Sequence, residues 1–193
     1  IDDSTLIVNG EPVTTFNRSA LYRNLKRISN KQEIDLSGNP EITDLSAISK
    51  LTELQEVNIS DTRVTDIIPL RNLTKLEVLV CSKCLVDDIS PLKYATNLKE
   101  LYFNHTPLSN ISVVENFPKL VKLDISGTKV QDLSPVANLD SLVDLRIGNT
   151  PVSDLSPLQN LHKLEILNCS NTNITDLSPL HEAHQLTLLF CDN

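Results

Sequence analysis

Leucine-type residues recur along this chain at a fixed spacing of 22 residues. Two such series run through most of the sequence. The first comprises Leu54, Leu76, Leu98, Leu120, Leu142, Leu164 and Leu186, and the second comprises Val57, Leu79, Leu101, Leu123, Leu145, Leu167 and Leu189. A period of this length indicates a repeat array, in which each unit buries its apolar face only against its neighbours. We therefore expect a solenoid rather than a domain built around one central core.

One unit, residues 120–141, reads LVKLDISGTKVQDLSPVANLDS. Polar and apolar residues alternate over Lys122–Ser126, which is typical of a half-buried strand. Stacked units would align these strands into a parallel sheet. The dipeptide Ser134-Pro135, which recurs in other units, suits the N-cap and first position of a helix. Because few residues remain before the next strand, we expect short 3₁₀ segments on the outer face.

Two polar series repeat with the units. Aspartates open each outer turn, and a carboxylate there can accept a backbone N–H two residues further on. Threonines follow each strand, where a buried hydroxyl can satisfy backbone groups that the turn leaves unpaired. The aspartate series is Asp44, Asp66, Asp88, Asp132, Asp154 and Asp176, with Asn110 in the missing place; the threonine series is Thr62, Thr106, Thr128, Thr150 and Thr172. Both series are predicted to be structural.

The N-terminal 30 residues depart from the repeat. Residues 6–13 read as a hairpin around Asn-Gly, and residues 17–28 read as a short helix with one apolar face. The first unit has one extra residue, so that Ile34 precedes Val57 by 23. We therefore predict an N-terminal cap over 1–30 and repeats over 31–193, about seven coils plus a last strand.

The C-terminal end of the array has no sealing segment. The last strand pattern ends in Phe190-Cys191, two residues before the end of the chain, and an apolar edge strand invites further pairing. Either more protein follows in the natural chain or another subunit covers this edge. The first residues include neither an initiator Met nor a signal peptide, which indicates a processed form or a fragment.

Charge and composition narrow the class of partner. The chain has 17 basic and 25 acidic residues, a formal net charge of −8, which disfavours nucleic acid and anionic membrane surfaces. No apolar stretch approaches the roughly 20 residues that span a bilayer, so membrane insertion is not expected.

The four cysteines are interpreted from their places in the repeat. Cys81, Cys169 and Cys191 occupy a position that faces inward in other units, and Cys84 stands where other units have Thr. Cys169 and Cys191 lie on adjacent rungs, close enough that a disulfide between them is an alternative, but free thiols are the preferred interpretation. Free thiols favour a reducing compartment such as the cytoplasm, with a bacterial secreted or cell-surface location as the alternative.

The unit pattern LxxLxxLxIxxTxVxDLSPLxx resembles the 22-residue leucine-rich repeats of the internalin type, which occur in bacterial surface and secreted proteins. The resemblance covers residues 31–193, although Thr or Cys replaces the Asn of that family in most units. It implies an α/β fold: a right-handed leucine-rich-repeat solenoid with a concave parallel β-sheet and a convex face of short 3₁₀ segments and turns. It also implies protein binding through the concave sheet and no cofactor.

The outward positions of the strands are the candidate binding surface. Such positions should be polar where water covers a sheet, but Val78, Val80 and Tyr102 break the rule on adjacent rungs. Apolar patches with a polar rim mark interaction sites. The predicted protein-binding residues are Glu56, Asn58, Val78, Val80, Glu100, Tyr102, Asn104, Lys122, Asp124 and Arg146. Charges alternate in sign along the lateral rows through Lys122 and through Arg146, which cross-strand pairing would explain.

A second apolar group lies near the C-terminal end. Ile166, Leu188 and Phe190 are predicted to form an assembly edge, either with missing sequence or with another subunit through self-association. The alternative to a binding module is therefore a structural spacer or assembly segment within a larger protein.

Enzymatic chemistry is disfavoured. His181 and His184 are three residues apart rather than the four of a zinc-binding His-Glu-x-x-His helix, and no third ligand is in view. The Cys81–Cys84 pair has CxxC spacing but occupies inward repeat positions rather than a helix start. With four glycines in total there is no phosphate-binding loop. We predict no catalytic or metal site and a protein partner whose identity the sequence leaves open.

Overall fold

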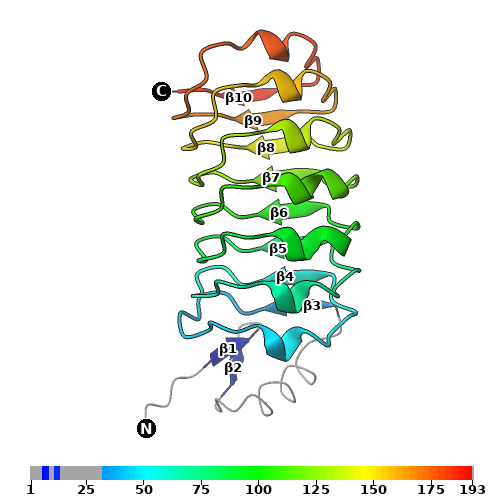
Figure 1. Cartoon of the computed structure of the whole chain (residues 1–193), viewed down its shortest axis with the longest axis vertical. Coiled ribbons are helices and arrows are strands. Elements are labelled where there is room, and N and C mark those ends of the chain that lie inside the picture. Colours follow the sequence, from blue (N-terminus) through cyan, green and yellow to red (C-terminus); the bar gives the residue numbers. More distant parts are fainter. Residues whose placement is uncertain (1–5, 9–10, 14–31, 193) are drawn as a thin grey trace.

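The computed structural model describes residues 6–8, 11–13 and 32–192 of the chain. Over this part the molecule is a stack of similar coils, each with one three-residue strand and one short 3₁₀ segment (Figure 1). Eight parallel strands form one sheet in the order β10-β9-β8-β7-β6-β5-β4-β3, so that each strand pairs with the next along the chain. The predicted solenoid with a parallel sheet is confirmed.

Each strand of the sheet has three residues, and its central residue points inward. Their bounds are β3 Glu33–Asp35, β4 Glu56–Asn58, β5 Val78–Val80, β6 Glu100–Tyr102, β7 Lys122–Asp124, β8 Asp144–Arg146, β9 Ile166–Asn168 and β10 Leu188–Phe190. The register pairs Ile34 with Val57 and Leu79 with Leu101, which keeps the central residue of every strand on one row. The extra residue of the first unit therefore lies outside the strand.

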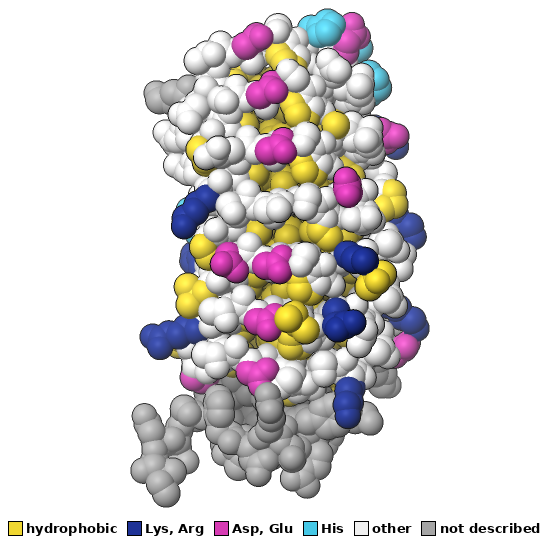
Figure 2. Space-filling view, in the orientation of Figure 1, with side chains coloured by type: hydrophobic (Ala, Val, Ile, Leu, Met, Phe, Trp, Pro, Cys, Tyr) yellow, Lys and Arg dark blue, Asp and Glu magenta, His cyan; other side chains and the backbone are white. Residues whose placement is uncertain are grey.

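The 3₁₀ segments line the opposite side of the stack. They are η1 Ser46–Ile48, η2 Ile68–Leu70, η3 Ser90–Tyr94, η4 Ser112–Asn116, η5 Ser134–Val136, η6 Ser156–Leu158 and η7 Ser178–Leu180. Figure 2 views the molecule from this side and shows acidic side chains recurring up the middle of the face. Such short segments suit the few residues between strands.

The aspartate series performs the predicted role. Asp88 Oδ1 accepts the backbone N–H of Ser90 at 2.8 Å, and the same bond recurs in every outer turn from Asp44 to Asp176. The prediction that the serine itself is the N-cap was wrong. Ser90 is the first residue of η3, and Ile89 at the N-cap makes no side-chain capping bond. The aspartate one residue further back supplies the acceptor instead.

The threonine series is also confirmed as structural. Thr150 Oγ1 donates to the carbonyl of Ile147 at 2.6 Å, and equivalent bonds occur at Thr62, Thr106, Thr128 and Thr172. In the first unit, buried Asn39 donates to the carbonyls of Leu36 and Ser37. Buried carbonyls without such a donor would lose a hydrogen bond to water without replacement.

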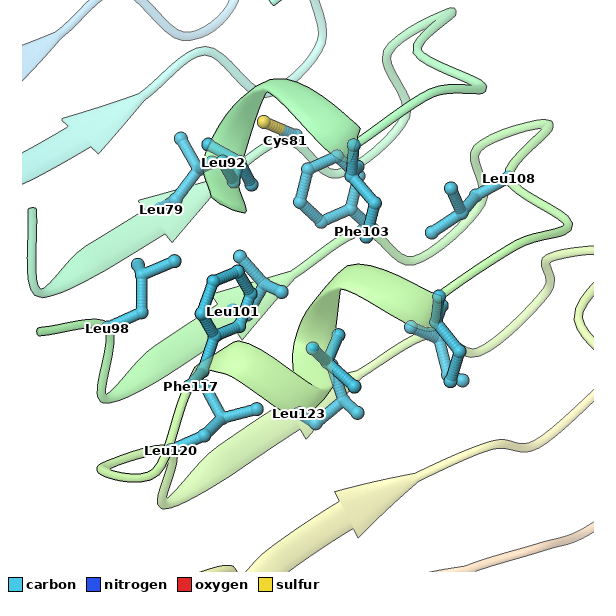
Figure 3. Packing of buried hydrophobic residues seen from close by; sticks show 14 of the residues in the cluster. Leu79, Cys81, Leu92, Leu98, Leu101, Phe103, Leu108, Phe117, Leu120 and Leu123 are labelled. Carbon is cyan, nitrogen blue, oxygen red and sulfur yellow. The ribbon is translucent and has the colours of Figure 1, made fainter. Parts of the chain in front are cut away.

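The core is one continuous column of side chains between the sheet and the 3₁₀ segments. Figure 3 shows leucines of successive coils stacked in it, with Phe103 and Phe117 packed among them. Leu79, Leu101 and Phe103 are fully buried. Each buried leucine stabilises the stack by about 1.5–3 kcal/mol. Because every coil packs only on its neighbours, this stabilisation is distributed along the array.

Each strand from β3 to β9 is followed, three residues after its end, by a residue with positive φ. Gly38 (φ 71°) and Gly127 (φ 69°) adopt this conformation at no steric cost. Elsewhere Asp, Lys, His and Asn take it, with φ between 55° and 58° at Asp61, Lys83, His105, Asn149 and Asn171. The turn is thus specified by hydrogen bonding and packing more than by glycine.

At the N-terminal end, β1 (Leu6–Val8) pairs antiparallel with β2 (Glu11–Val13), and Val8 lies opposite Glu11. This pairing agrees with the predicted hairpin. The predicted helix over 17–28 lies outside the described residues, so the cap over 1–30 stays a prediction.

At the C-terminal end, Cys191 occupies an inward position of the repeat and is nevertheless exposed. Cys81, Cys84 and Cys169 are buried, but Cys191 is exposed, and all four are free thiols. The coil that carries Cys191 has a neighbour on one side only among the described residues. Its inward positions are therefore open to water: Leu189, which pairs with fully buried Leu167, is 39% exposed.

Candidate interaction surface on the sheet

The outward positions of the strands form a continuous face, here called the concave face. It consists of two rows, because the first and third residues of each strand point away from the core. The first row runs Glu33, Glu56, Val78, Glu100, Lys122, Asp144, Ile166 and Leu188, and the second runs Asp35, Asn58, Val80, Tyr102, Asp124, Arg146, Asn168 and Phe190. The predicted site residues of the strands all lie on these rows.

Three apolar residues meet in the middle of this face. Val78 and Val80 lie on β5, and Tyr102 on β6 is the register partner of Val80. All three are partly buried rather than fully exposed. The three side chains thus lie side by side on adjacent strands and are each partly accessible to solvent.

Tyr102 is held by a hydrogen bond along its own strand. Its hydroxyl donates to Glu100 Oε2 at 2.6 Å, and Lys122 Nζ lies 3.0 Å from Oε1 of the same carboxylate. Burial, followed by the Glu100 carboxylate, raises the pKa of the Tyr102 hydroxyl well above its usual value. Burial would raise the pKa of Glu100, but hydrogen bonds from Tyr102 and Lys122 outweigh it and lower that pKa. The ring is thus fixed in one orientation.

Charge pairing on this face follows the strands as well as the rungs. The predicted cross-strand pair of Lys122 with Glu100 is present. The predicted lateral pairing of Arg146 with Asp124 was wrong, because Arg146 forms a two-pronged bond with Asp144 on its own strand, at 3.0 and 2.9 Å. This bond to Asp144 is the main reason that the pKa of Arg146 is raised. Asp144 is buried, whereas the Arg146 side chain is 48% exposed.

Several predicted rim residues also accept hydrogen bonds within the coils. Asn58 Oδ1 accepts the N–H of Ser60 at 3.1 Å, and Asp124 Oδ1 accepts the N–H of Ser126 at 2.9 Å. Asn104 Oδ1 accepts a hydrogen bond from the hydroxyl of Ser82 on the preceding coil. These side chains fix the turns after the strands, so their presence on the face is explained without a ligand.

A hollow of about 470 Å³ opens on the concave face over the first three strands of the sheet. Its polar lining includes Glu33, Asp35, Glu56 and Asn58, and Val78 and Val80 close its other side. The sequence analysis missed Glu33 and Asp35. The signal was available, because the 23-residue spacing from Ile34 to Val57 places Glu33 beside Glu56.

The second apolar group lies where predicted. Ile166 is partly buried, whereas Leu188 is 48% and Phe190 46% exposed. Below them, Cys169 and Cys191 line a cavity of about 190 Å³ with Thr172 and apolar neighbours. Burial, followed by the proximity of Cys191, raises the pKa of the Cys169 thiol.

Sequence reasoning did not find three exposed apolar side chains on other faces. Ile68, Leu85 and Tyr94 are each more than half exposed. Ile68 and Tyr94 belong to η2 and η3, and Lys93 Nζ lies 4.9 Å from the centre of the Tyr94 ring. They are separate from the concave face and provide a matched comparison for it.

The histidine and cysteine motifs remain apart from the concave face. His181 and His184 both contact Glu182 at 3.3 and 3.0 Å on the exposed turn after η7. Cys84 Sγ lies 2.9 Å from the carbonyl of Ile59, in the place of a repeat threonine. Over the described ranges, no three His, Cys, Asp or Glu side chains cluster as metal ligands would. Nor does any helix there have the length and apolar character needed to cross a bilayer.

The molecule is a repeat scaffold: parallel strands and short 3₁₀ segments stack around a shared core, and the outward side chains of the sheet form one continuous face. The family described as leucine-rich repeats (2 copies) matches residues 52–94, 96–138, 118–160 and 140–182. The chain belongs to the leucine-rich-repeat family, and its repeats are of the internalin type.

Three of the solved structures with a similar fold are of bacterial proteins. Internalin C2 of Listeria monocytogenes is 27% identical, with a TM-score of 0.83 over 93% of this chain and 84% of that one. A leucine-rich-repeat protein of Leptospira interrogans is 21% identical, with a TM-score of 0.79 over 84% of this chain and 43% of its own. The functional domain of InlJ from Listeria monocytogenes, described as including a cysteine ladder, is 18% identical, with a TM-score of 0.61 over 87% and 45%. No curated protein sequence matches the chain at a significant level.

Proposed function

We propose that this domain is a protein-binding module whose partner contacts the concave face around Val78, Val80 and Tyr102. The observation that carries the proposal is the position of these three partly exposed apolar residues on adjacent strands. A water-covered sheet face is ordinarily polar. An aromatic residue surrounded by polar side chains is typical of the centre of a protein interface.

The surroundings of Tyr102 support this role. Its hydroxyl bond to Glu100, and the ion pair of Glu100 with Lys122, hold the ring before any partner arrives. A side chain that is already ordered loses less conformational entropy on binding. Asn58, Glu56, Asn104, Asp124 and Arg146 complete the polar rim.

The class of protein supports binding rather than catalysis. Leucine-rich-repeat proteins are typically interaction modules, and the similar solved structures are of bacterial proteins. We propose that the chain is a bacterial, non-enzymatic domain of this kind. Its formal net charge of −8 favours protein over nucleic acid as the partner.

Affinity capture from native-cell and host lysates, read by mass spectrometry, tests the concave face. The wild type is compared with Val80→Glu/Tyr102→Glu, and with Ile68→Glu/Tyr94→Glu as a matched control on another face. All three are first shown by circular dichroism to be folded. A protein captured by the wild type and the control but lost by the concave variant supports the proposal. Capture lost only by the control would move the binding surface to the 3₁₀ side.

A second candidate function, assembly through β10, is favoured by the exposure of Leu188, Leu189 and Phe190. An edge strand with exposed apolar side chains can pair with a strand of another copy. Sedimentation of the wild type and of Leu188→Lys/Phe190→Lys tests self-association. Concentration-dependent dimers that the double variant lacks would support it, and a monomer at all concentrations would refute it. If no substitution on the concave face changes capture, that result would support the alternative in which the domain is a structural spacer of a larger protein.

A further inference from the structure

The hollow over β3, β4 and β5 carries two carboxylates in an unfavourable position. Glu33 and Glu56 are register partners on adjacent strands, and both are exposed. Like charges directly opposite each other in a sheet destabilise the pair. Among the described residues, neither carboxylate has a cationic partner.

Three other carboxylates of the strand region are paired with cations. Glu100 and Asp144 of the concave face, and Glu77 just before β5, each lie within 3.0 Å of a Lys or Arg nitrogen. Asp124 of this face also has no ion pair among the described residues, but its register partners are Tyr102 and Arg146. Within the described sheet, two carboxylates are register partners only at Glu33 and Glu56, where the hollow lies. The pKa of Glu56 is raised, first by burial and then by the negative charges of Glu33, Glu100 and Glu77.

The hollow also has an apolar wall. Val78 and Val80 line it opposite the carboxylates, within a volume of about 470 Å³. Lys and Arg side chains combine an aliphatic stem with a charged head, and such a chain can lie along valine while its head reaches a carboxylate. The shape and the charge of the hollow thus complement the same kind of side chain.

We propose that this hollow selects the partner: it receives a segment of another protein in which a Lys or Arg stands next to an aliphatic residue, with the cation between Glu33 and Glu56 and the aliphatic group on Val78 and Val80. This inference rests on the proposed function of the concave face and adds the chemistry of what binds there.

Phage-displayed random dodecapeptides are the probe. They are selected on the wild type, and the affinity of the enriched peptides is measured for three variants. Glu33→Gln/Glu56→Gln removes the two carboxylates, Val80→Glu/Tyr102→Glu removes the apolar centre, and Glu115→Gln/Asp140→Asn removes two exposed carboxylates away from the sheet as a control. Thermal melts show that each variant is folded.

We expect enriched peptides with Lys or Arg beside an aliphatic residue. Their affinity should fall about tenfold with Glu33→Gln/Glu56→Gln and not with the control, because each lost charge contact weakens binding. The wild-type affinity should also fall with added NaCl, since exposed charges are screened.

Other outcomes overturn the inference in distinguishable ways. Peptides that Glu33→Gln/Glu56→Gln binds as well as the wild type, but Val80→Glu/Tyr102→Glu does not, would refute the charge selection and leave the concave face as the binding surface. Peptides insensitive to both variants would refute both proposals. A selection without basic-aliphatic enrichment, or a wild-type dimer that Glu33→Gln/Glu56→Gln abolishes, would show that the hollow has a different occupant.

Discussion

The hydroxyl of Tyr102 lies 2.6 Å from the carboxylate of Glu100, two residues earlier on β6, and donates a hydrogen bond to it. The carboxylate also pairs with Lys122 on the next strand. A ring on the face of the sheet is thereby tied to a charge network that spans two coils. The network affects both stability and the surface offered to a partner. The pKa of Glu100 is lowered, whereas the pKa of Glu56 on β4 is raised, so the two carboxylates affect stability with opposite sign.

Replacing Glu100 by Gln should destabilise the fold at neutral pH. The pKa of Glu100 is lowered in the folded state, so its contribution is present above the pKa of the unfolded chain and is lost as pH falls through the folded pKa. We expect Glu100→Gln to reduce the free energy of unfolding by about 0.5–1 kcal/mol at pH 7, with the difference shrinking as the pH falls below the ordinary Glu pKa of about 4.3. Urea titrations across this range measure it. A constant difference at all pH values would contradict the network.

Replacing Glu56 by Gln should have the opposite sign. The pKa of Glu56 is raised, first by burial and then by Glu33, so its charge opposes folding above the folded pKa and ceases to do so as the group protonates. We expect Glu56→Gln to increase the free energy of unfolding by about 0.3 kcal/mol at pH 7, a gain that vanishes in acid. The same titrations test it. A loss of stability at pH 7 would show that Glu56 has a stabilising partner.

Removing one hydroxyl of the threonine series should cost more than its small volume suggests. Thr150 Oγ1 donates to the carbonyl of Ile147 at 2.6 Å in a buried turn. Thr150→Val leaves that carbonyl with one donor fewer, which should lower the free energy of unfolding by about 1–2 kcal/mol. Thr65→Val, at an exposed position, is the matched control and should change little. Equal costs at the two sites, from chemical denaturation, would refute a structural role for the buried hydroxyl.

The four cysteines should differ in reactivity. Cys191 is exposed, whereas Cys81, Cys84 and Cys169 are buried. Burial also raises the pKa of the Cys81 thiol well above its usual value, which reduces the reactive thiolate further. Alkylation of the native protein, followed by peptide mass spectrometry, should modify Cys191 first and the other three only after unfolding. Rapid native labelling of Cys81 would mean that the coils open readily.

Two glycines with positive φ allow backbone strain to be separated from a side-chain clash. A Cβ at Gly38 would have open space, but at Gly127 it would lie 2.4 Å from Nδ1 of His105. Because His105 is exposed, its ring can turn away. We therefore expect Gly38→Ala and Gly127→Ala to cost similar amounts, about 1 kcal/mol each. NMR should show the His105 ring shifted only in Gly127→Ala. A much larger cost at Gly127 would mean that the ring is fixed.

The repeat pattern was sufficient to predict the fold and the roles of its recurring residues. The 22-residue spacing predicts the buried rows and the structural roles of the aspartate and threonine series. This succeeded because a solenoid coil contacts only its neighbours, so that a position in the repeat has nearly the same environment in each coil. The equivalence ends in the last described coil, where the inward position of Cys191 is exposed.

The contacts between side chains on the concave face were decided by the tertiary structure. The sequence by itself determined which side chains lie on the concave face, since the alternation of a strand and the register of the coils leave no other choice. It did not determine that Arg146 bonds to Asp144 rather than Asp124, that Tyr102 is tied to Glu100, or that Glu33 and Asp35 join Val78 and Val80 around one hollow. Long side chains choose among several partners at similar distances, and that choice depends on rotamers and neighbours in three dimensions rather than on spacing along the chain.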